Sequence, residues 1–271
     1  MENVHNLIKK ALQLHEQGKI QDAINIYLKV LENKKNDPQL LNLLGAAYIQ
    51  IGYTDKGIEQ LKKSISLKPE NLFVHSNLGN ALLDLKRYDE ALTSYDKAIE
   101  INPNYAEIHN NKGNALKNLE LYDEAIASYN KAIEINPDYS FAYNNKGNAL
   151  KNLERYEEAI VNFDKAIQIN SSYIEAYHNK GNILKDLKRY DEAIASYNKV
   201  IEINPDYYFS YNNRGIIFQY LNHFEKALAS YDKAIEINPN YPETYNNKGN
   251  ILKELKRYDE ALTCYEKAIK L

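Results

Sequence analysis

Asparagine is the residue type whose spacing in this sequence points most directly to chemistry, because it recurs in two rows with a period of 34 residues. A side-chain amide carries both donor and acceptor groups. A row of them can therefore bond the N–H and C=O groups of an extended peptide without reading its side chains. The first row comprises Asn77, Asn111, Asn145, Asn179, Asn213 and Asn247, and the second comprises Asn80, Asn114, Asn148, Asn182 and Asn250. We interpret both rows as a candidate peptide-binding surface; the alternatives are braces between neighbouring helices and plain solvation.

A lysine row keeps the same period three residues after the second asparagine row, at Lys117, Lys151 and Lys185. Spacings of three and four residues place side chains on one helical face, so these lysines would share a surface with the asparagines. Such a row could attract an acidic peptide, or it could be a solvated helix end. Phenylalanine alternates with glutamate at a further position of the period and would either grip apolar side chains or pack between neighbours.

Residues that could catalyse a reaction are isolated or are explained by their periodic copies. The six histidines include no His-Glu-x-x-His pair for a metal. Cys264 has no histidine near it and stands where the period elsewhere has serine, so a spare thiol is the better interpretation than a nucleophile. Paired acids such as Asp123-Glu124 recur at expected helix starts, where the helix dipole favours them. The sequence therefore predicts no catalytic residue, no metal ligand and no cofactor.

Composition and charge exclude several other classes of protein. The 271 residues are 44% hydrophobic and 26% charged, which is typical of a globular chain. The net charge of −3 and the uniform asparagine rows argue against nucleic acid as a partner. No run of about 18 apolar residues could span a membrane, so we expect no membrane partner. A single cysteine excludes an intrachain disulfide and fits a reducing compartment, from which we expect a cytoplasmic protein.

Glycines define the period of the whole chain, because seven of them, from Gly45 to Gly249, are each 34 residues from the next. A fixed period of this length is typical of stacked structural repeats rather than of independent domains. We place the glycine at position 8 of each repeat, so the asparagine rows fall at positions 6 and 9. Residues 1–271 are then predicted to form a single array of repeats 1 to 8, which span 4–37, 38–71, 72–105, 106–139, 140–173, 174–207, 208–241 and the incomplete 242–271.

Each repeat is expected to form two helices. In repeat 4, apolar residues such as Ile108 and Leu116 recur at helical spacing, and a second stripe contains Ile126 and Tyr129. Gly113 is expected where the two helices approach too closely for a side chain. Asn-Pro pairs should stop the second helix, because the residue before proline is pushed out of the α region. Basic residues are expected to end the first helix, where they suit its dipole.

This pattern resembles the tetratricopeptide repeat. The family signature consists of glycine at position 8, alanine at 20 and 27, an aromatic residue at 24 and proline at 32, and it recurs over residues 38–271 with a weaker copy in 4–37. The family's tryptophan at position 4 is replaced here by tyrosine or histidine, which changes packing and not the fold. The resemblance implies an all-α, right-handed superhelical solenoid of about eight repeats, whose first helices line the concave face.

The resemblance also implies a function, because the family's ligand-facing positions include the asparagine and lysine rows. The rows are similar to the asparagine ladder in the superhelical arm of O-linked N-acetylglucosamine transferases. We expect a non-enzymatic scaffold that binds extended protein segments in its concave groove. The first alternative is an N-terminal substrate-recognition arm of a larger enzyme such as a glycosyltransferase, which the reading frame after Leu271 would reveal. The second is a near-consensus array without an evolved ligand.

One binding mode of the family is not expected here. The carboxylate clamp for acidic chaperone tails requires lysine at positions 5 and 2, and position 2 is never lysine in this chain. The clamp asparagines are present, but the cations that would capture a carboxylate are missing. Tight binding of a chaperone-tail peptide that depends on Asn80 and Asn111 would contradict this prediction.

The two ends of the chain lead to different expectations. Residues 4–37 keep the two-helix pattern but lose the glycine at position 8, as a terminal capping repeat should. At the other end, Ile269 and Leu271 lie on an apolar face that no polar helix follows. We expect either that the chain is a piece of a longer protein or that it self-associates through its C-terminal helix.

Overall fold

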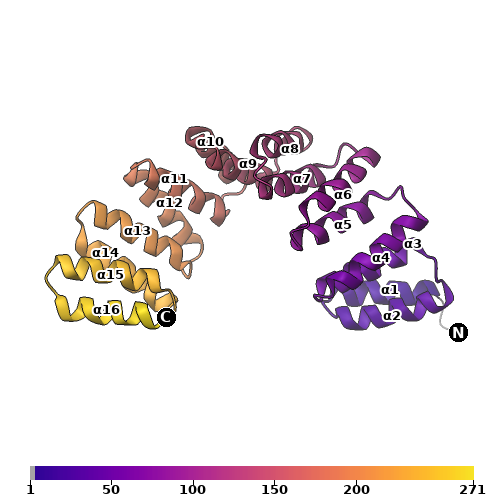
Figure 1. Ribbon diagram of the computed structural model, residues 1–271, viewed down its shortest axis with the longest axis horizontal. Coiled ribbons are helices and arrows are strands. Elements are labelled where there is room, and N and C mark those ends of the chain that lie inside the picture. Colours follow the sequence, from indigo (N-terminus) through magenta and orange to yellow (C-terminus); the bar gives the residue numbers. More distant parts are fainter. Residues whose placement is uncertain (1–3) are drawn as a thin grey trace. The chain divides into compact units, whose positions relative to one another are not determined.

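The computed structural model describes residues 4–271, which form sixteen α-helices, two in each repeat (Figure 1). The chain divides into two compact halves, Met1–Pro137 and Asp138–Leu271. The N-terminal half contains α1 (Val4–Glu16), α2 (Ile20–Asn33), α3 (Pro38–Gln50), α4 (Thr54–Leu67), α5 (Leu72–Asp84), α6 (Tyr88–Ile101), α7 (Ala106–Asn118) and α8 (Tyr122–Ile135). The C-terminal half contains α9 (Ser140–Asn152), α10 (Tyr156–Ile169), α11 (Ile174–Asp186), α12 (Tyr190–Ile203), α13 (Tyr208–Tyr220), α14 (Phe224–Ile237), α15 (Pro242–Glu254) and α16 (Tyr258–Lys270). The prediction of an all-α fold built from about eight helix pairs is confirmed; the superhelical hand and the single array over residues 1–271 stay predictions.

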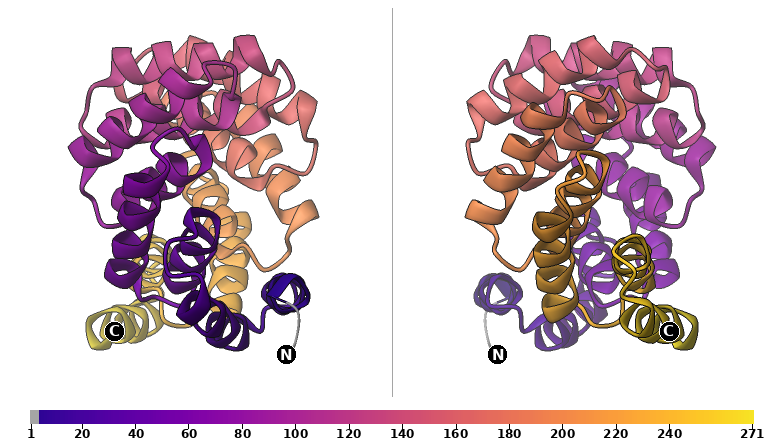
Figure 2. Two further views of the ribbon diagram at one scale, coloured as in Figure 1. Left: turned by 90° about the vertical axis from the view of Figure 1, so that its right-hand side faces the viewer. Right: turned by 90° about the vertical axis from the view of Figure 1, so that its left-hand side faces the viewer.

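Helices within each half pack in chain order, which Figure 2 shows from two sides. The first helices of neighbouring repeats also contact one another: α3 with α5, α5 with α7, α9 with α11, α11 with α13, and α13 with α15. They therefore form a continuous surface in each half, which we call the first-helix face. Side chains at fixed repeat positions recur along this face, because each repeat presents its first helix in the same way.

Glycine at position 8 makes room for an aromatic ring rather than for a helix backbone. A Cβ added to Gly113 would lie 2.5 Å from a ring carbon of Tyr129, the aromatic residue at position 24 of the same repeat. The expected close approach of two helices occurs instead in repeat 2, where a Cβ on Gly45 would lie 3.0 Å from the carbonyl oxygen of Gly57. The expectation for Gly113 was right about crowding and wrong about its cause.

The turn inside a repeat contains a residue in the left-handed region. Gly18 and Gly52 occupy it in repeats 1 and 2, and Lys188 occupies it with φ 59° in repeat 6. A left-handed residue just past a helix ends that helix. Consequently α11 stops at Asp186 with the basic Lys185 in its last turn, as expected, and Lys188 and Arg189 lie in the turn that follows.

In repeat 5, asparagine at position 31 closes the turn between repeats without a proline at position 32. Helix α10 ends at Ile169 although Ser171 replaces the proline, so the proline is not required to stop it. The Asn170 side chain accepts hydrogen bonds from the backbone N–H and the hydroxyl of Ser172, at 3.1 and 2.9 Å. Such local side-chain bonding offers the backbone an alternative to continuing the helix. Asn102, Asn204 and Asn238 accept the equivalent backbone bond in their own turns.

Candidate peptide-binding face

The asparagines predicted as peptide ligands lie on the first helices α5, α7, α9, α11, α13 and α15, and all eleven are half-buried. The helical positions 6 and 9 are separated by three residues, so one helix presents both on the same side. The first-helix face therefore carries both rows, as the spacing predicts. The hydrogen bonds of these side chains determine which of their amide groups remain available to a peptide.

A set of three residues, which we call the Tyr–Asn–Asn brace, joins neighbouring repeats. The Tyr95 hydroxyl and the Asn111 side-chain N–H both donate to Oδ1 of Asn80, at 2.8 and 3.0 Å. The C-terminal half repeats the arrangement, since Tyr197 and Asn213 donate to Oδ1 of Asn182 at 2.8 and 3.0 Å. In each brace, position 9 of one repeat accepts from its own position 24 and from position 6 of the next repeat.

A second bonding pattern occurs at the three other junctions for which these bonds are described. There the position-6 side chain donates to asparagine at position 5 of the preceding repeat: Asn77 to Asn42 at 3.1 Å, Asn179 to Asn144 at 3.2 Å, and Asn247 to Asn212 at 3.3 Å. In these preceding repeats, position 9 is Ala46, Asn148 beside Phe163, or Ile216, so no brace can form. At the five junctions whose bonds are described, position 6 thus bonds to position 9 only where a tyrosine hydroxyl also binds that position-9 asparagine.

Position-5 asparagines are the residues that sequence reasoning missed as braces. Asn144 and Asn212 are buried, with exposed fractions of 5% and 3%, so their side chains face the helix packing rather than a ligand. The signal that could have identified them is the recurrence of asparagine at position 5 in repeats 2, 4, 5, 7 and 8. A buried amide needs a partner, and the next repeat supplies it.

The braces occupy the side-chain oxygens of the position-9 asparagines and do not use their N–H2 groups. Oδ1 of Asn80 and of Asn182 each receives two hydrogen bonds, while neither residue's N–H2 group makes a bond within residues 4–271. Asn148 makes no side-chain hydrogen bond within that range, because Phe163 replaces the tyrosine that would donate to it. The half-buried face thus offers amide donors that could bind the carbonyl groups of an extended chain.

The lysine row is half-buried on the same face and produces a local positive field. The pKa of His178 is lowered to about 4, mainly by burial and in addition by the charges of Lys185 and Lys151. Lys185 lies 3.8 Å from Asp186, and Lys117 is also half-buried. These lysines are close enough to His178 to act on its charged form, so they can act equally on a negatively charged ligand.

Phenylalanine at position 2 packs against tyrosines and stays exposed, so packing is observed and a contact with apolar side chains of a ligand stays a prediction. The ring of Phe141 lies 6.1 Å from Tyr139 and 5.2 Å from Tyr173, yet 54% of Phe141 is exposed. Phe73 has one such neighbour, Tyr105 at 5.9 Å. These rings flank the first-helix face as an apolar edge.

The histidines and the cysteine considered as candidates for chemistry have separate environments in the described chain. Within residues 4–271, no three His, Cys, Asp or Glu side chains could share a metal ion. His75 and His109 are buried, and each ring lies 2.8 Å from a proline carbonyl oxygen, of Pro69 and Pro103 respectively. Burial raises the pKa of the Cys264 thiol, which disfavours the nucleophilic thiolate.

Two expectations remain, one about membrane-spanning segments and one about self-association through the C-terminal helix. No helix within residues 4–271 combines the length and the apolar character needed to cross a bilayer. Ile269 on α16 is 84% exposed, and Leu262 is 59% exposed. Self-association through this helix stays a prediction.

Family models match most of the chain. The model described as tetratricopeptide repeat matches residues 106–139, 140–173, 174–207, 208–241 and 242–271. A second TPR repeat model matches residues 79–120, and a model of the anaphase-promoting complex, cyclosome, subunit 3 matches residues 16–98. No curated protein sequence matches the chain.

Several solved structures are similar to this one. A crystal structure of MamA is 29% identical with a TM-score of 0.56, covering 59% of this chain and 94% of its own. YrrB, described as a TPR protein with an unusual peptide-binding site, is 28% identical with a TM-score of 0.56, covering 69% of this chain and 96% of its own. A tetratricopeptide repeat protein from Parabacteroides merdae covers 93% of this chain and 100% of its own at 18% identity and a TM-score of 0.70, which supports the fold alone.

Proposed function

Because this chain belongs to the tetratricopeptide repeat family, we propose that it is a non-enzymatic scaffold that binds extended protein segments along its first-helix face. The single observation that carries the proposal is the row of half-buried position-9 amides whose N–H2 groups remain available. Asn80 and Asn182 offer donors beside saturated acceptors, and Asn148 offers both kinds of group. A peptide backbone in extended conformation presents carbonyl oxygens that match such donors.

The lysine row and the phenylalanine edge give the proposed face its preferences. Lys117, Lys151 and Lys185 would favour segments with acidic side chains, and Phe73, Phe141 and Phe209 would contact apolar ones. Backbone recognition would supply affinity with little dependence on sequence, whereas these flanking residues would supply modest selectivity. YrrB is a TPR protein of similar fold with an unusual peptide-binding site, which supports a peptide as the ligand class.

The experiment begins with a randomised synthetic peptide library, and the affinities of the recovered peptides are then measured by fluorescence polarisation. Asn148→Ala should weaken binding about tenfold, as expected when one well-placed hydrogen bond and its geometry are lost. This variant should keep the fold, since the Asn148 side chain bonds to nothing within residues 4–271. Asn130→Ala, which removes an exposed amide from the second helix α8, is the matched control and should bind normally.

The outcomes separate a binding face from a purely structural one. If no peptide is recovered, or if Asn148→Ala and Asn130→Ala bind equally well, the asparagine rows are braces and not ligands. Replacing Asn111, Asn145 and Asn179 together by alanine complements this test. A loss of binding with intact helicity supports the proposal, whereas a collapse in melting temperature assigns these residues to the fold.

A further inference from the structure

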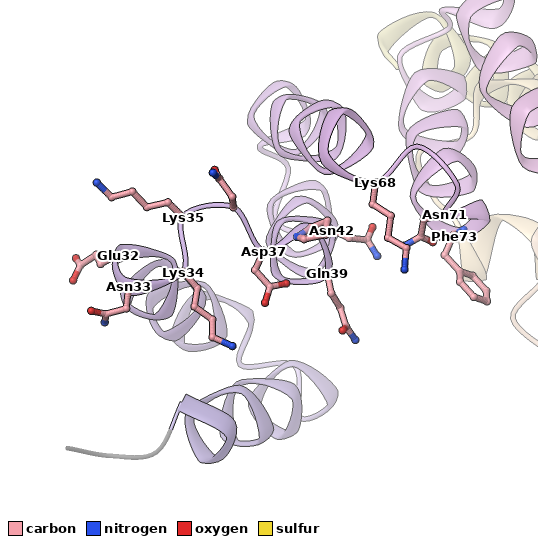
Figure 3. A pocket seen from close by; sticks show the side chains of 12 residues that line it. Glu32, Asn33, Lys34, Lys35, Asp37, Gln39, Asn42, Lys68, Asn71 and Phe73 are labelled. Atoms are coloured by element: carbon pink, nitrogen blue, oxygen red, sulfur yellow. Dashed lines mark hydrogen bonds between the residues drawn. The ribbon is translucent and has the colours of Figure 1, made fainter.

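A cavity where repeats 1, 2 and 3 meet is lined by none of the asparagines of the two rows. It has a volume of about 1070 Å³ and lies between the end of α2, the start of α3 and the loop that joins α4 to α5 (Figure 3). Its lining includes Lys34, Lys68, Gln39, Asn42 and Phe73. All of these residues belong to the N-terminal half of the chain.

Two departures from the repeat pattern explain why the cavity is present here. Position 34 is tyrosine in repeats 3 to 7 but Asp37 and Asn71 in repeats 1 and 2. In repeat 4, Tyr139 at this position lies 6.1 Å from the ring of Phe141, which is position 2 of repeat 5. Phe73 is preceded by Asn71 instead, so the smaller side chain leaves that side of the ring open to the cavity.

The second departure is a change of charge at position 31. Asparagine stands there in repeats 3 to 7 and closes the turn, whereas repeats 1 and 2 have Lys34 and Lys68. Both side chains extend into the same opening, while Lys35 extends to the other side of its loop (Figure 3). Within residues 4–271, none of these three lysines forms an ion pair, although many other lysines do, such as Lys63 with Glu59 at 2.7 Å.

The acidic residues of the lining do not neutralise these cations. The Asp37 carboxylate caps α3 by accepting a hydrogen bond from the backbone N–H of Leu40 at 3.0 Å, so its charge is stabilised by the helix N-terminus. Glu32 lies on the last turn of α2, at the far side of the opening from Lys68 (Figure 3). Two unpaired ammonium groups therefore face one cavity that also has amide donors and an open aromatic ring.

We propose that this cavity binds an acidic peptide segment. Its carboxylates would lie between Lys34 and Lys68, and a neighbouring apolar side chain would pack on the open side of Phe73. An ammonium group within about 4 to 6 Å stabilises a carboxylate in its charged form. The Phe73 ring adds apolar area against which a neighbouring apolar side chain can be buried. The inference rests on the proposed function, because it specifies that the scaffold's protein ligand is acidic and that it binds at this cavity.

The test uses the whole chain and two labelled synthetic peptides, one with glutamates flanking a leucine and one with glutamines in their place. Fluorescence polarisation should show tighter binding of the glutamate peptide, with affinity that falls as salt is raised. The double variant Lys34→Ala with Lys68→Ala should weaken that binding about tenfold. Lys35→Ala removes the same charge from the same loop and should change affinity less than about twofold. Phe73→Ala should weaken both peptides.

Three results would overturn the cavity assignment: equal affinity for the two peptides, equal losses from Lys35→Ala and from the Lys34 and Lys68 pair, or equally strong competition by a single-stranded RNA of matched charge. Since all three lysines are exposed, circular dichroism of the variants should be unchanged. Glutamate-peptide binding that falls with Asn148→Ala but not with the lysine pair would also overturn the cavity while supporting the proposed function. Binding that falls with the lysine pair but not with Asn148→Ala would support the cavity and contradict the role of Asn148.

Discussion

The side chain of Asn111 donates a hydrogen bond to Oδ1 of Asn80 across the boundary between repeats 3 and 4, at 3.0 Å. The same oxygen accepts from the hydroxyl of Tyr95, whose ring fills the space left by Gly79. Glycine admits the ring, the ring's hydroxyl orients the amide, and the amide holds the next repeat. The stability of a repeat array is roughly the sum of the stabilities of its repeats and of the interfaces between neighbouring repeats. This brace contributes to one such interface.

Replacing Asn80 by alanine should destabilise the protein by about 1–3 kcal/mol, because the buried Tyr95 hydroxyl and the Asn111 amide both lose their shared acceptor. Asn148→Ala is the matched control, since it deletes the same position-9 side chain without breaking a side-chain hydrogen bond within residues 4–271. Its effect should stay within about 0.5 kcal/mol. Urea unfolding followed by circular dichroism measures both. Equal losses for the two variants would mean that the brace contributes nothing to stability.

Gly113→Ala should destabilise the protein by about 1–3 kcal/mol, because the new Cβ would lie 2.5 Å from the Tyr129 ring and force that ring to shift. The cost should be smaller when Tyr129→Leu, which copies the leucine of repeat 2, is present in the same chain. A double-mutant cycle on the unfolding free energies measures this coupling. Strict additivity would show that the clash lies with some other group.

Stability should depend on His178 in acid. Burial holds its pKa at about 4 in the folded state, below the unfolded value of 6.5, so the unfolded chain binds more protons between these values. The stabilising contribution is complete above about pH 6.5 and is lost as the pH falls toward about 4, with a size of about 3 kcal/mol. His178 contacts the rings of Tyr197 and Tyr207, and Lys151 and Lys185 oppose its protonation.

The measurement for His178 is urea unfolding at a series of pH values. His178→Asn places at position 5 the residue found in repeats 5 and 7, and it should flatten the acid limb of the profile. Tyr207→Phe, which leaves the imidazole in place, serves as the control and should keep the slope. An unchanged slope in His178→Asn would assign the acid sensitivity to other groups.

The sequence predicts the helix pairs and the location of both asparagine rows, because period and helical spacing determine which side chains share a face. It could not predict which atom each asparagine bonds. The acceptor of a position-6 asparagine depends on the residue at position 24 of the preceding repeat. Where that residue is tyrosine, as in repeat 6, Asn213 bonds to position 9; where it is Phe163, in repeat 5, Asn179 bonds to position 5. The cavity at Lys34 and Lys68 could not be predicted either, because it forms between two loops that are separate in the sequence and meet only in the folded chain.

Phe163→Tyr should convert the junction between repeats 5 and 6 to the braced form. The added hydroxyl would reach Asn148 as Tyr197 reaches Asn182 at 2.8 Å, and Asn179 would then exchange its acceptor on Asn144 for the newly oriented Oδ1 of Asn148. A satisfied buried hydrogen bond should add about 1 kcal/mol to the free energy of unfolding.

The gain from Phe163→Tyr should disappear in an Asn148→Ala background, which a double-mutant cycle on unfolding free energies measures. Peptide binding provides an independent readout, because the variant would occupy the acceptor of Asn148 and leave only its donors for a ligand. Peptides that use both groups should therefore bind more weakly to the more stable protein. If the tyrosine variant gains stability equally with and without Asn148, its hydroxyl has found another partner and the rule that links position 24 to position 6 does not hold.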